Sequence, residues 1–555
     1  MTSRWTRLST SVAALAAVAL AAPAVRRGMV PPTVTDRTAP QSPAARPAYS
    51  ITYYGLRLRF EPEHHSVRGD VVIGMRGPNR IAARGPAPLT LDLDTTMTID
   101  SVVVAGTRVA ETRQGQAVIV PMAIAAGDLR LVDVYYHGTP AGDALVFGRH
   151  GDAPVISSYG LPYSARSWWP SIDAPRAKAD SADIEITAPS ALVAASNGRL
   201  VARRENADGT ATTQWSVRYP IYPDVIAVAV SNYALLTLAY RSPGGDSLPM
   251  PFYVFPEDLE KARVDFAVLP AMLAHHVARF GPYPFMREKY GVVEMAQESF
   301  REHQTLPGYG SHLITGDHTN DWILAHELAH QWFGDALTVR NWSHAWLNEG
   351  FATYAALLWR EQSVGKADYL AAARRQMVPE TYNGVLYVAD SANVAQMFTR
   401  VTFQKGALVL HMLRHVMGDS AFFRALHSYV AGNLYRTVTT ADFERAAETS
   451  YRRPLDWFFR EWVYRGGAPE YSVSGLSVTP SRSGYRVAFD VRQCQDSGVF
   501  RMPLDVALTT RSGVVVRVAW DSARAQHMAF DTPDSVTAVA LDPDGWVVTA
   551  NAHAH

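Results

Sequence analysis

Two short stretches organise this sequence: His326-Glu327-Leu328-Ala329-His330 and, further along, Trp346-Leu347-Asn348-Glu349-Gly350. Residues four apart on a helix lie on one face, so His326 and His330 can present two imidazole nitrogens to a single ion. Glu349 can add a carboxylate from a second helix, and Glu327 is placed to accept a proton from water rather than to bind the ion. Two histidines and a carboxylate, with a fourth position open, are typical of a hydrolytic zinc site. The sequence therefore predicts a zinc hydrolase with one Zn2+ per chain.

The alternative is that the two histidines lie on the solvated face of an ordinary helix. The segment is too apolar for open water, because Leu328, Ala329, Trp332 and Phe333 accompany the histidines. The composition therefore favours a buried helix, and with it the metal site.

Length and charge bound the class of protein. A chain of 555 residues is too long for one hydrophobic core and indicates roughly two to four domains. Hydrophobic residues make up 48% and charged residues 19%, which is ordinary for a globular protein and excludes a largely disordered chain. Lys plus Arg equals Asp plus Glu, at 52 each. This balance argues against nucleic acid or an anionic membrane as the main partner.

The first residues are typical of an exported protein. Arg4 and Arg7 precede an apolar run, and Ala22-Pro23-Ala24 offers a small-x-small cleavage site, so we expect a signal peptide over 1–24. An uncleaved membrane anchor is the alternative, but the run is short and rich in alanine. Residues 25–47 are rich in Pro, Ala and Thr and predict a flexible linker.

The mature protein is expected to be periplasmic or secreted, with no membrane-spanning segment after signal cleavage. Export permits disulfides, but Cys494 is the only cysteine, so the fold must depend on packed cores. We interpret Cys494 as structural.

Hydrophobic periodicity divides the rest of the chain into three parts. A β-rich domain is predicted over 48–245, where apolar residues alternate between Gly, Pro and Asp turns. Over 246–468 the apolar period changes to that of a helix, which predicts a mostly helical domain around the zinc segment. Alternation returns over 469–548 and predicts a small C-terminal β domain. The expected strands include 51–60, 70–75, 117–120, 183–186, 471–478, 485–491, 504–508, 514–520 and 536–541, and the expected helices include 259–280, 350–362, 367–377 and 404–416.

Further motifs accompany the zinc segment: Ser196-Asn197-Gly198, the segment 166–179, Gly281-Pro282-Tyr283-Pro284-Phe285 and Lys405-Gly406-Ala407. Taken alone, Trp168 and Trp169 in segment 166–179 read as core or interface residues. With these motifs the chain resembles the aminopeptidase N family of gluzincins, peptidase family M1, from about residue 49 to 548. The resemblance implies an α+β multidomain fold: an N-terminal β-saddle domain, a thermolysin-like, mostly helical catalytic domain and a small C-terminal β-sandwich.

The resemblance also assigns roles to individual residues. It implies that His326, His330 and Glu349 are the zinc ligands and that Glu327 is the general base. Glu302, in Arg301-Glu302-His303-Gln304-Thr305, corresponds to a glutamate that binds the free α-amine of the substrate. Without the resemblance, Glu302 would read as a solvated carboxylate.

Three positions depart from the family's pattern. Arg301 replaces the usual methionine beside the amine-binding glutamate, and Leu161 stands where members commonly carry Gln or Glu for the same amine. Phe403 occupies the position of a tyrosine whose hydroxyl stabilises the oxyanion. Losing one such donor typically costs on the order of a hundred- to a thousand-fold in turnover. Four residues are alternative donors, although packing or surface roles are the simpler interpretation of each: Tyr382, Tyr387, His303 and Arg301.

These observations support two hypotheses. The first is an exported zinc metallopeptidase, an aminopeptidase by family, that hydrolyses peptides with Glu327 as the base. The second is a catalytically impaired relative that keeps zinc and acts as a peptide-binding or scaffold protein, motivated by Phe403 and the altered amine site. The intact Glu327 favours the first, because a purely structural zinc site needs no base and is usually closed by a fourth protein ligand. The sequence leaves the oligomeric state and the side-chain preference open.

Overall fold

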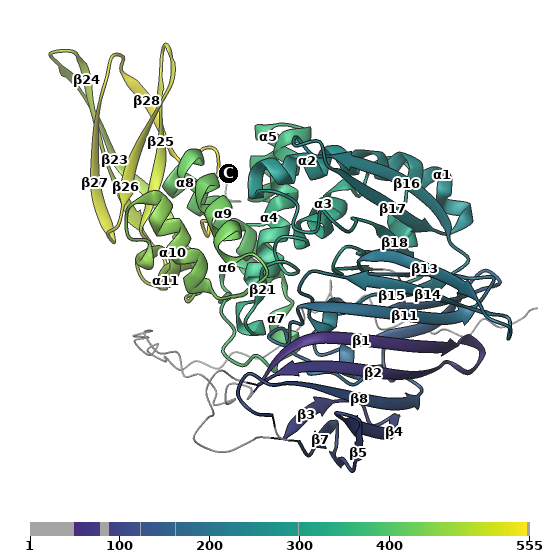
Figure 1. Cartoon of the computed structure of the whole chain (residues 1–555). Coiled ribbons are helices and arrows are strands. Elements are labelled where there is room, and N and C mark those ends of the chain that lie inside the picture. Colours follow the sequence, from purple (N-terminus) through teal and green to yellow (C-terminus); the bar gives the residue numbers. More distant parts are fainter. Residues whose placement is uncertain (1–48, 78–87, 123, 161, 298, 552–555) are drawn as a thin grey trace, which may run out of the picture.

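The computed structural model describes residues 49–77, 88–122, 124–160, 162–297 and 299–551. The expected signal peptide (1–24) and linker (25–47), and Leu161, lie outside the described residues. Along the chain, a β part is followed by a mostly helical part and then by a second β part (Figure 1). This order confirms the predicted fold class.

An eight-stranded sheet forms most of the N-terminal part. Its strands form where apolar residues alternate: Leu56, Leu58 and Phe60 of the first strand are all buried in the core. The first strand pairs in parallel with β11, and the rest of the sheet is antiparallel. In spatial order the sheet comprises β13 (Arg199–Glu205), β14 (Thr210–Val217), β11 (Ser181–Pro189), β1 (Ser50–Glu61), β2 (Ser66–Arg76), β8 (Leu129–Gly138), β4 (Met97–Val104) and β5 (Thr107–Val109).

Two smaller sheets complete the N-terminal part. Trp169 is fully buried and meets Tyr54 edge-on at 5.2 Å between ring centroids, so it is a core residue. Lys178, in the same segment, reaches the helical part: its Nζ donates to the carbonyl oxygens of Asp335 (2.6 Å) and Ala336 (3.0 Å). The two sheets comprise β3 (Leu89–Asp92), β7 (Ala117–Val120) and β6 (Thr112–Gln114), and β12 (Val193–Ser196), β15 (Val228–Ser231), β10 (Ala153–Ser158) and β9 (Leu145–His150).

A five-stranded mixed sheet opens the helical part. The domain boundary expected at 245 falls in the turn 242–246 of a hairpin whose two strands both belong to this sheet. A Ser-Pro-Gly-Gly-Asp turn marks a hairpin as readily as a linker between domains. In spatial order the strands are β16 (Ala234–Arg241), β17 (Ser247–Val254), β18 (Val292–Met295), β20 (Gly308–Gly310) and, at the edge, β19 (Phe300–Arg301).

The expected helices of this part begin and end close to the expected limits, with one interruption, and further helices accompany them. The single helix expected over 259–280 is interrupted by a 3-10 turn at Phe266–Val268, because Pro270 is suited to the first turn of a new helix and not to a helix interior. The helices are α1 (Leu259–Asp265), α2 (Leu269–Phe280), α3 (Asp321–His330), α4 (Trp346–Ser363), α5 (Lys366–Arg374), α6 (Pro379–Tyr382), α7 (Val394–Met397), α8 (Gly406–Met417), α9 (Asp419–Asn433), α10 (Thr440–Tyr451) and α11 (Asp456–Trp462), with the short strands β21 (Thr338–Val339) and β22 (Thr437–Val438) paired between them.

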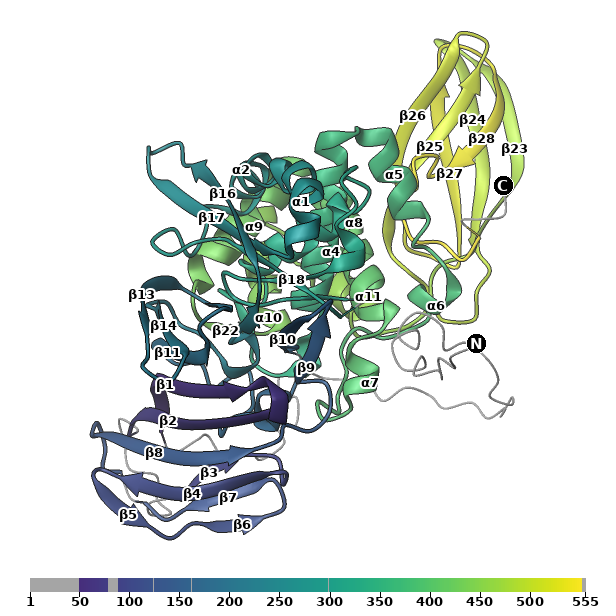
Figure 2. The same cartoon turned by 90° about the vertical axis from the view of Figure 1, so that its right-hand side faces the viewer.

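The C-terminal part is a sandwich of two three-stranded sheets, drawn in yellow in Figure 2. The chain then returns to the helical part, where the Trp546 ring stacks on His411 at 4.7 Å and on His415 at 5.3 Å between centroids. None of the helices in the described ranges combines the length and the apolarity that a bilayer crossing requires. The sheets comprise β23 (Tyr471–Ser481), β24 (Gly484–Gln493) and β27 (Ala525–Thr532), and β26 (Gly513–Asp521), β25 (Met502–Thr510) and β28 (Val536–Leu541).

Candidate metal centre

Helices α3 and α4 bring the three predicted ligands together. The Nε2 atoms of His326 and His330 lie 3.0 Å apart, and Oε2 of Glu349 lies 3.3 Å and 3.5 Å from them, respectively. Donors held about 2.0–2.1 Å from a tetrahedral ion lie roughly 3.3 Å from one another. The three donor atoms therefore have the spacing and the chemistry of a zinc site with one open position.

Close contact between α4 and α8 holds Glu349 in place. A Cβ on Gly350 or on Gly406 would lie 2.7 Å from the other glycine's Cα, so only glycine fits at this crossing. Glu349 immediately precedes Gly350, and Phe403 lies in the π-helical turn (Val401–Lys405) that leads into α8. The crossing thus determines how the third ligand and Phe403 approach α3.

His330 is oriented by hydrogen bonds behind its ring. Nδ1 lies 2.6 Å from Oδ1 of Asn348 and 3.1 Å from the carbonyl oxygen of Phe333, both of which are acceptors. Nδ1 therefore carries the proton, which leaves the Nε2 lone pair for a metal. The residue type of Asn348 does not indicate this orienting role. In the sequence, its position directly before Glu349 is the only signal for it.

Glu327 is buried beside the ligands, and its Oε2 has no hydrogen-bond partner among the described residues. Burial, and then the nearby carboxylates Glu349 and Glu302, raise its pKa well above the ordinary value, while Arg301 opposes the shift. A carboxylate whose pKa is raised in this way is a stronger base than a solvated one. The geometry suits the predicted proton acceptor.

Glu302 lies behind His330 rather than in solvent. Its Oε2 accepts a hydrogen bond from Asn348 Nδ2 at 2.8 Å and lies 3.5 Å from His330 Nδ1, while Oε1 has no partner among the described residues. Burial raises the pKa of Glu302 to about 7. The reading of Glu302 as a solvated carboxylate is therefore wrong, because the side chain is buried among Asn348, His330 and Asp335.

Two of the three departures from the family's pattern lie close to the centre. Phe403 stacks on the predicted ligand His326, with 6.0 Å between ring centroids and an interplanar angle of 17°. The Arg301 guanidinium lies over the Tyr159 ring, 3.4 Å from its centroid. Burial raises the pKa of both Glu327 and Glu349, and the charge of Arg301 opposes that rise.

The other residues considered as oxyanion donors pack elsewhere or are neutral. Tyr387 packs against His344 and Tyr464, at 5.4 Å and 5.5 Å between ring centroids, and Tyr382 contacts Lys405 through its backbone carbonyl. Burial lowers the pKa of His303 to about 3, so its ring is neutral at physiological pH. Of the four candidates, only Arg301 combines a positive charge with an electrostatic effect on the predicted ligand Glu349.

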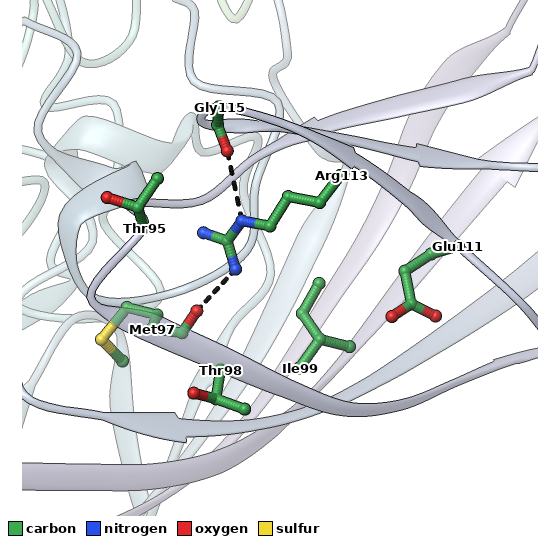
Figure 3. Close-up of a pocket in the computed structure, with 7 residues that line it drawn as sticks. All are labelled: Thr95, Met97, Thr98, Ile99, Glu111, Arg113 and Gly115. Carbon is green, nitrogen blue, oxygen red and sulfur yellow. Dashed lines mark hydrogen bonds between the residues drawn. The ribbon is translucent and has the colours of Figure 1, made fainter.

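A surface hollow in the N-terminal part lies on other elements (Figure 3). Its central side chain, Arg113, already donates to the carbonyl oxygens of Met97 (2.6 Å), Gly115 (3.2 Å) and Leu93 (2.9 Å). The guanidinium thus serves the fold rather than a ligand. The hollow is lined by Thr95, Met97, Thr98, Ile99, Glu111, Arg113 and Gly115.

Comparison with known proteins agrees with this centre. The chain matches the Peptidase family M1 domain over residues 306–462 and the Peptidase M1 N-terminal domain over 146–221. Aminopeptidase M1 of Arabidopsis thaliana is 27% identical over 332 residues, covering 56% of this chain and 37% of the relative. This chain spans only about a fifth to just over a third of the length of such curated relatives.

Solved structures extend the likeness across more of the chain. An M1 zinc metallopeptidase from Deinococcus radiodurans is 27% identical with a TM-score of 0.65, covering 76% of this chain and 95% of that one. Aminopeptidase A of Legionella pneumophila, at 18% identity, shares the fold with a TM-score of 0.79 over 90% of this chain and 59% of that chain. The resemblance to peptidase family M1 is thus confirmed by matches to two of the family's domains and by relatives that are M1 aminopeptidases.

Proposed function

We propose that this chain is an exported zinc-dependent aminopeptidase that binds one zinc ion through His326, His330 and Glu349. The observation that carries the proposal is the convergence of these three donor atoms beside the buried Glu327. The likeness to a zinc metallopeptidase of the same family supports zinc and peptide hydrolysis. Segment 1–24 supports export, because arginines precede an apolar, alanine-rich run as in a signal peptide.

Different residues of the site carry out different steps of peptide hydrolysis. Zinc, when bound, polarises the scissile carbonyl and makes water more acidic. Glu327 accepts the proton of the attacking water and passes it to the leaving amine. Glu302, at the position to which the family resemblance assigns amine binding, accepts a hydrogen bond from the substrate's α-amine and so selects for a free N-terminus.

The requirement for a free N-terminus is the direct test. The zinc-loaded protein and a Glu302→Gln variant are incubated with peptide pairs that differ only in N-terminal acetylation, and the products are read by mass spectrometry. We expect stepwise loss of N-terminal residues from the free peptides alone, and a higher KM in the variant. Equal cleavage of the acetylated peptides would show an endopeptidase and contradict the aminopeptidase assignment.

One observation favours a second function. Phe403 stacks against a zinc ligand and has no hydroxyl group, so the centre lacks the oxyanion donor that the family resemblance places there. A protein with this loss would bind peptides and cleave them slowly or not at all. If the hydroxyl is simply missing, Phe403→Tyr raises turnover by roughly a hundredfold, because one oxyanion donor is worth that much. Tight peptide binding without turnover in both proteins would instead support the peptide-binding function.

A further inference from the structure

The Ser196-Asn197-Gly198 motif of the N-terminal part contacts segment 302–305 of the helical part. The motif's asparagine, Asn197, donates through Nδ2 to the carbonyl oxygen of Gln304 at 2.5 Å. The backbone N–H of its glycine donates to Oγ1 of Thr305 at 2.8 Å. Both Asn197 and Thr305 are fully buried, where hydrogen bonds are stronger than in water. The motif therefore holds this segment from the N-terminal side.

Gln331, the residue after the predicted ligand His330, holds the same segment from the other side. Its Oε1 accepts the backbone N–H of Thr305 at 2.8 Å, and its Nε2 donates to the carbonyl oxygen of His303 at 3.2 Å. The carbonyl oxygen of Thr305 in turn accepts the N–H of Gly291 at 2.9 Å. The N–H, the carbonyl and the hydroxyl of Thr305 are thus bound to three different parts of the chain.

Thr305 has a backbone conformation that its own side chain disfavours. Its φ angle is +62°, in the left-handed region, which a β-branched residue rarely adopts. Such a conformation persists where surrounding contacts enforce it, and it often accompanies a functional constraint. The hydrogen bonds to Thr305 come from both the N-terminal and the helical part, so the turn depends on the contact between the two.

The turn at Thr305 determines where Glu302 lies. Glu302 is three residues before Thr305, and its Oε2 accepts a hydrogen bond from Asn348 at 2.8 Å and lies 3.5 Å from Nδ1 of His330. A site that binds by hydrogen bonds needs its groups held to within about 0.5 Å. Loosening the turn should therefore move the Glu302 carboxylate while the zinc ligands, which lie on α3 and α4, stay in place.

We propose that Thr305 is a positioning residue for Glu302, and that its hydroxyl sets the affinity of the site for a free N-terminus. The inference rests on the proposed aminopeptidase function, in which Glu302 binds the α-amine of the substrate. It makes this binding depend on Gly198, a residue of the N-terminal part. Because the amine is bound in the ground state and in the transition state alike, loss of the hydroxyl raises KM and leaves kcat unchanged.

The test measures kcat and KM of the zinc-loaded full chain on peptides with a free N-terminus. Thr305→Val keeps the branched shape without the hydroxyl, Thr305→Ala removes the hydroxyl and leaves a smaller side chain, and Thr305→Ser keeps the hydroxyl. Thr532→Val is the matched control, because Thr532 is also buried and its Oγ1 donates to the carbonyl oxygen of Asp534 at 2.8 Å, but it lies in the C-terminal sandwich. Zinc content and thermal unfolding are measured for every variant.

We expect Thr305→Val and Thr305→Ala to raise KM by roughly threefold to tenfold, the effect of one ordinary hydrogen bond, with kcat and zinc content unchanged. Thr305→Ser and Thr532→Val should keep the KM of the wild type. An unchanged KM in both variants that lack the hydroxyl would overturn the inference.

Two other results would also overturn it. A loss of kcat at constant KM would show that the hydroxyl acts on the reaction and not on amine binding. Unfolding of both Thr305→Val and Thr305→Ala would show that the hydroxyl serves the fold as a whole. With a wild type that cleaves free peptides, these results defeat this inference alone, whereas no cleavage by the wild type defeats the proposed function as well.

Discussion

Gly406→Ala tests the helix crossing on which the third zinc ligand depends. A Cβ at this position would lie 2.7 Å from Gly350 Cα, whereas carbon atoms in contact are normally about 3.5–4.0 Å apart. Helices α4 and α8 must therefore separate by roughly 1 Å to accommodate the methyl group. Because Glu349 precedes Gly350, the separation moves the carboxylate away from His326 and His330.

The expected change in the free energy of unfolding is the sum of two opposing effects. Alanine improves helix propensity over glycine by about 1 kcal/mol, while overpacking of this kind costs about 1–3 kcal/mol. Gly432→Ala isolates the first effect, because Gly432 lies in α9 and a Cβ there meets nothing within 4 Å. Gly406→Ala should therefore be about 1–3 kcal/mol less stable than Gly432→Ala.

The assay has two readouts for each variant. Urea unfolding of the metal-free proteins gives the free energy of unfolding, and competition with a chelator gives the zinc affinity. We expect Gly406→Ala alone to lose zinc affinity, because only this substitution displaces a ligand helix. Equal stability and equal zinc affinity in the two alanine variants would refute the role assigned to the crossing.

Two further predictions concern buried basic side chains. Burial holds the pKa of His276 at about 4, below the 6.5 of an unfolded chain, so the unfolded state binds an extra proton and stability falls as the pH drops from 6.5 towards 4. The wild type therefore loses more unfolding free energy between pH 7 and pH 5 than His276→Phe does, by about 2 kcal/mol. Urea unfolding of the metal-free proteins measures this difference, and an equal loss in the two proteins would contradict the prediction. Lys178→Met removes the Nζ donor that binds Asp335 O, Ala336 O and Thr338 Oγ1, and it should lower the unfolding free energy by about 2–4 kcal/mol. A urea midpoint equal to that of the wild type would show that the contact between the N-terminal and helical parts does not depend on this amino group.

The local spacing of the zinc segment predicted most of the centre. His326 and His330 are four positions apart, and helical geometry alone brings their rings to one face. The burial of the helix followed from its apolar neighbours, and every one of Leu328, Ala329, Trp332 and Phe333 is buried. Both properties depend on residues that are close together in the sequence, so a single sequence is enough to predict them.

Contacts between distant segments were not predictable in this way. Asn348 orients His330, and Glu302 lies against both, but the partners come from three elements and no spacing rule connects them. The glycine contact between α4 and α8 likewise depends on tertiary packing. By contrast, the break between α1 and α2 has a local signal, Pro270, which the prediction from the apolar period alone left out.

The most direct test of the account is the effect of Glu327→Gln on turnover and on zinc content in the same samples. The side chain keeps its size, loses its ability to accept a proton, and is not one of the three converging ligands. We expect one zinc per chain in both proteins and a loss of kcat of at least about a hundredfold in the variant, the scale of general-base catalysis. Equal peptide hydrolysis by the two zinc-loaded proteins would contradict it.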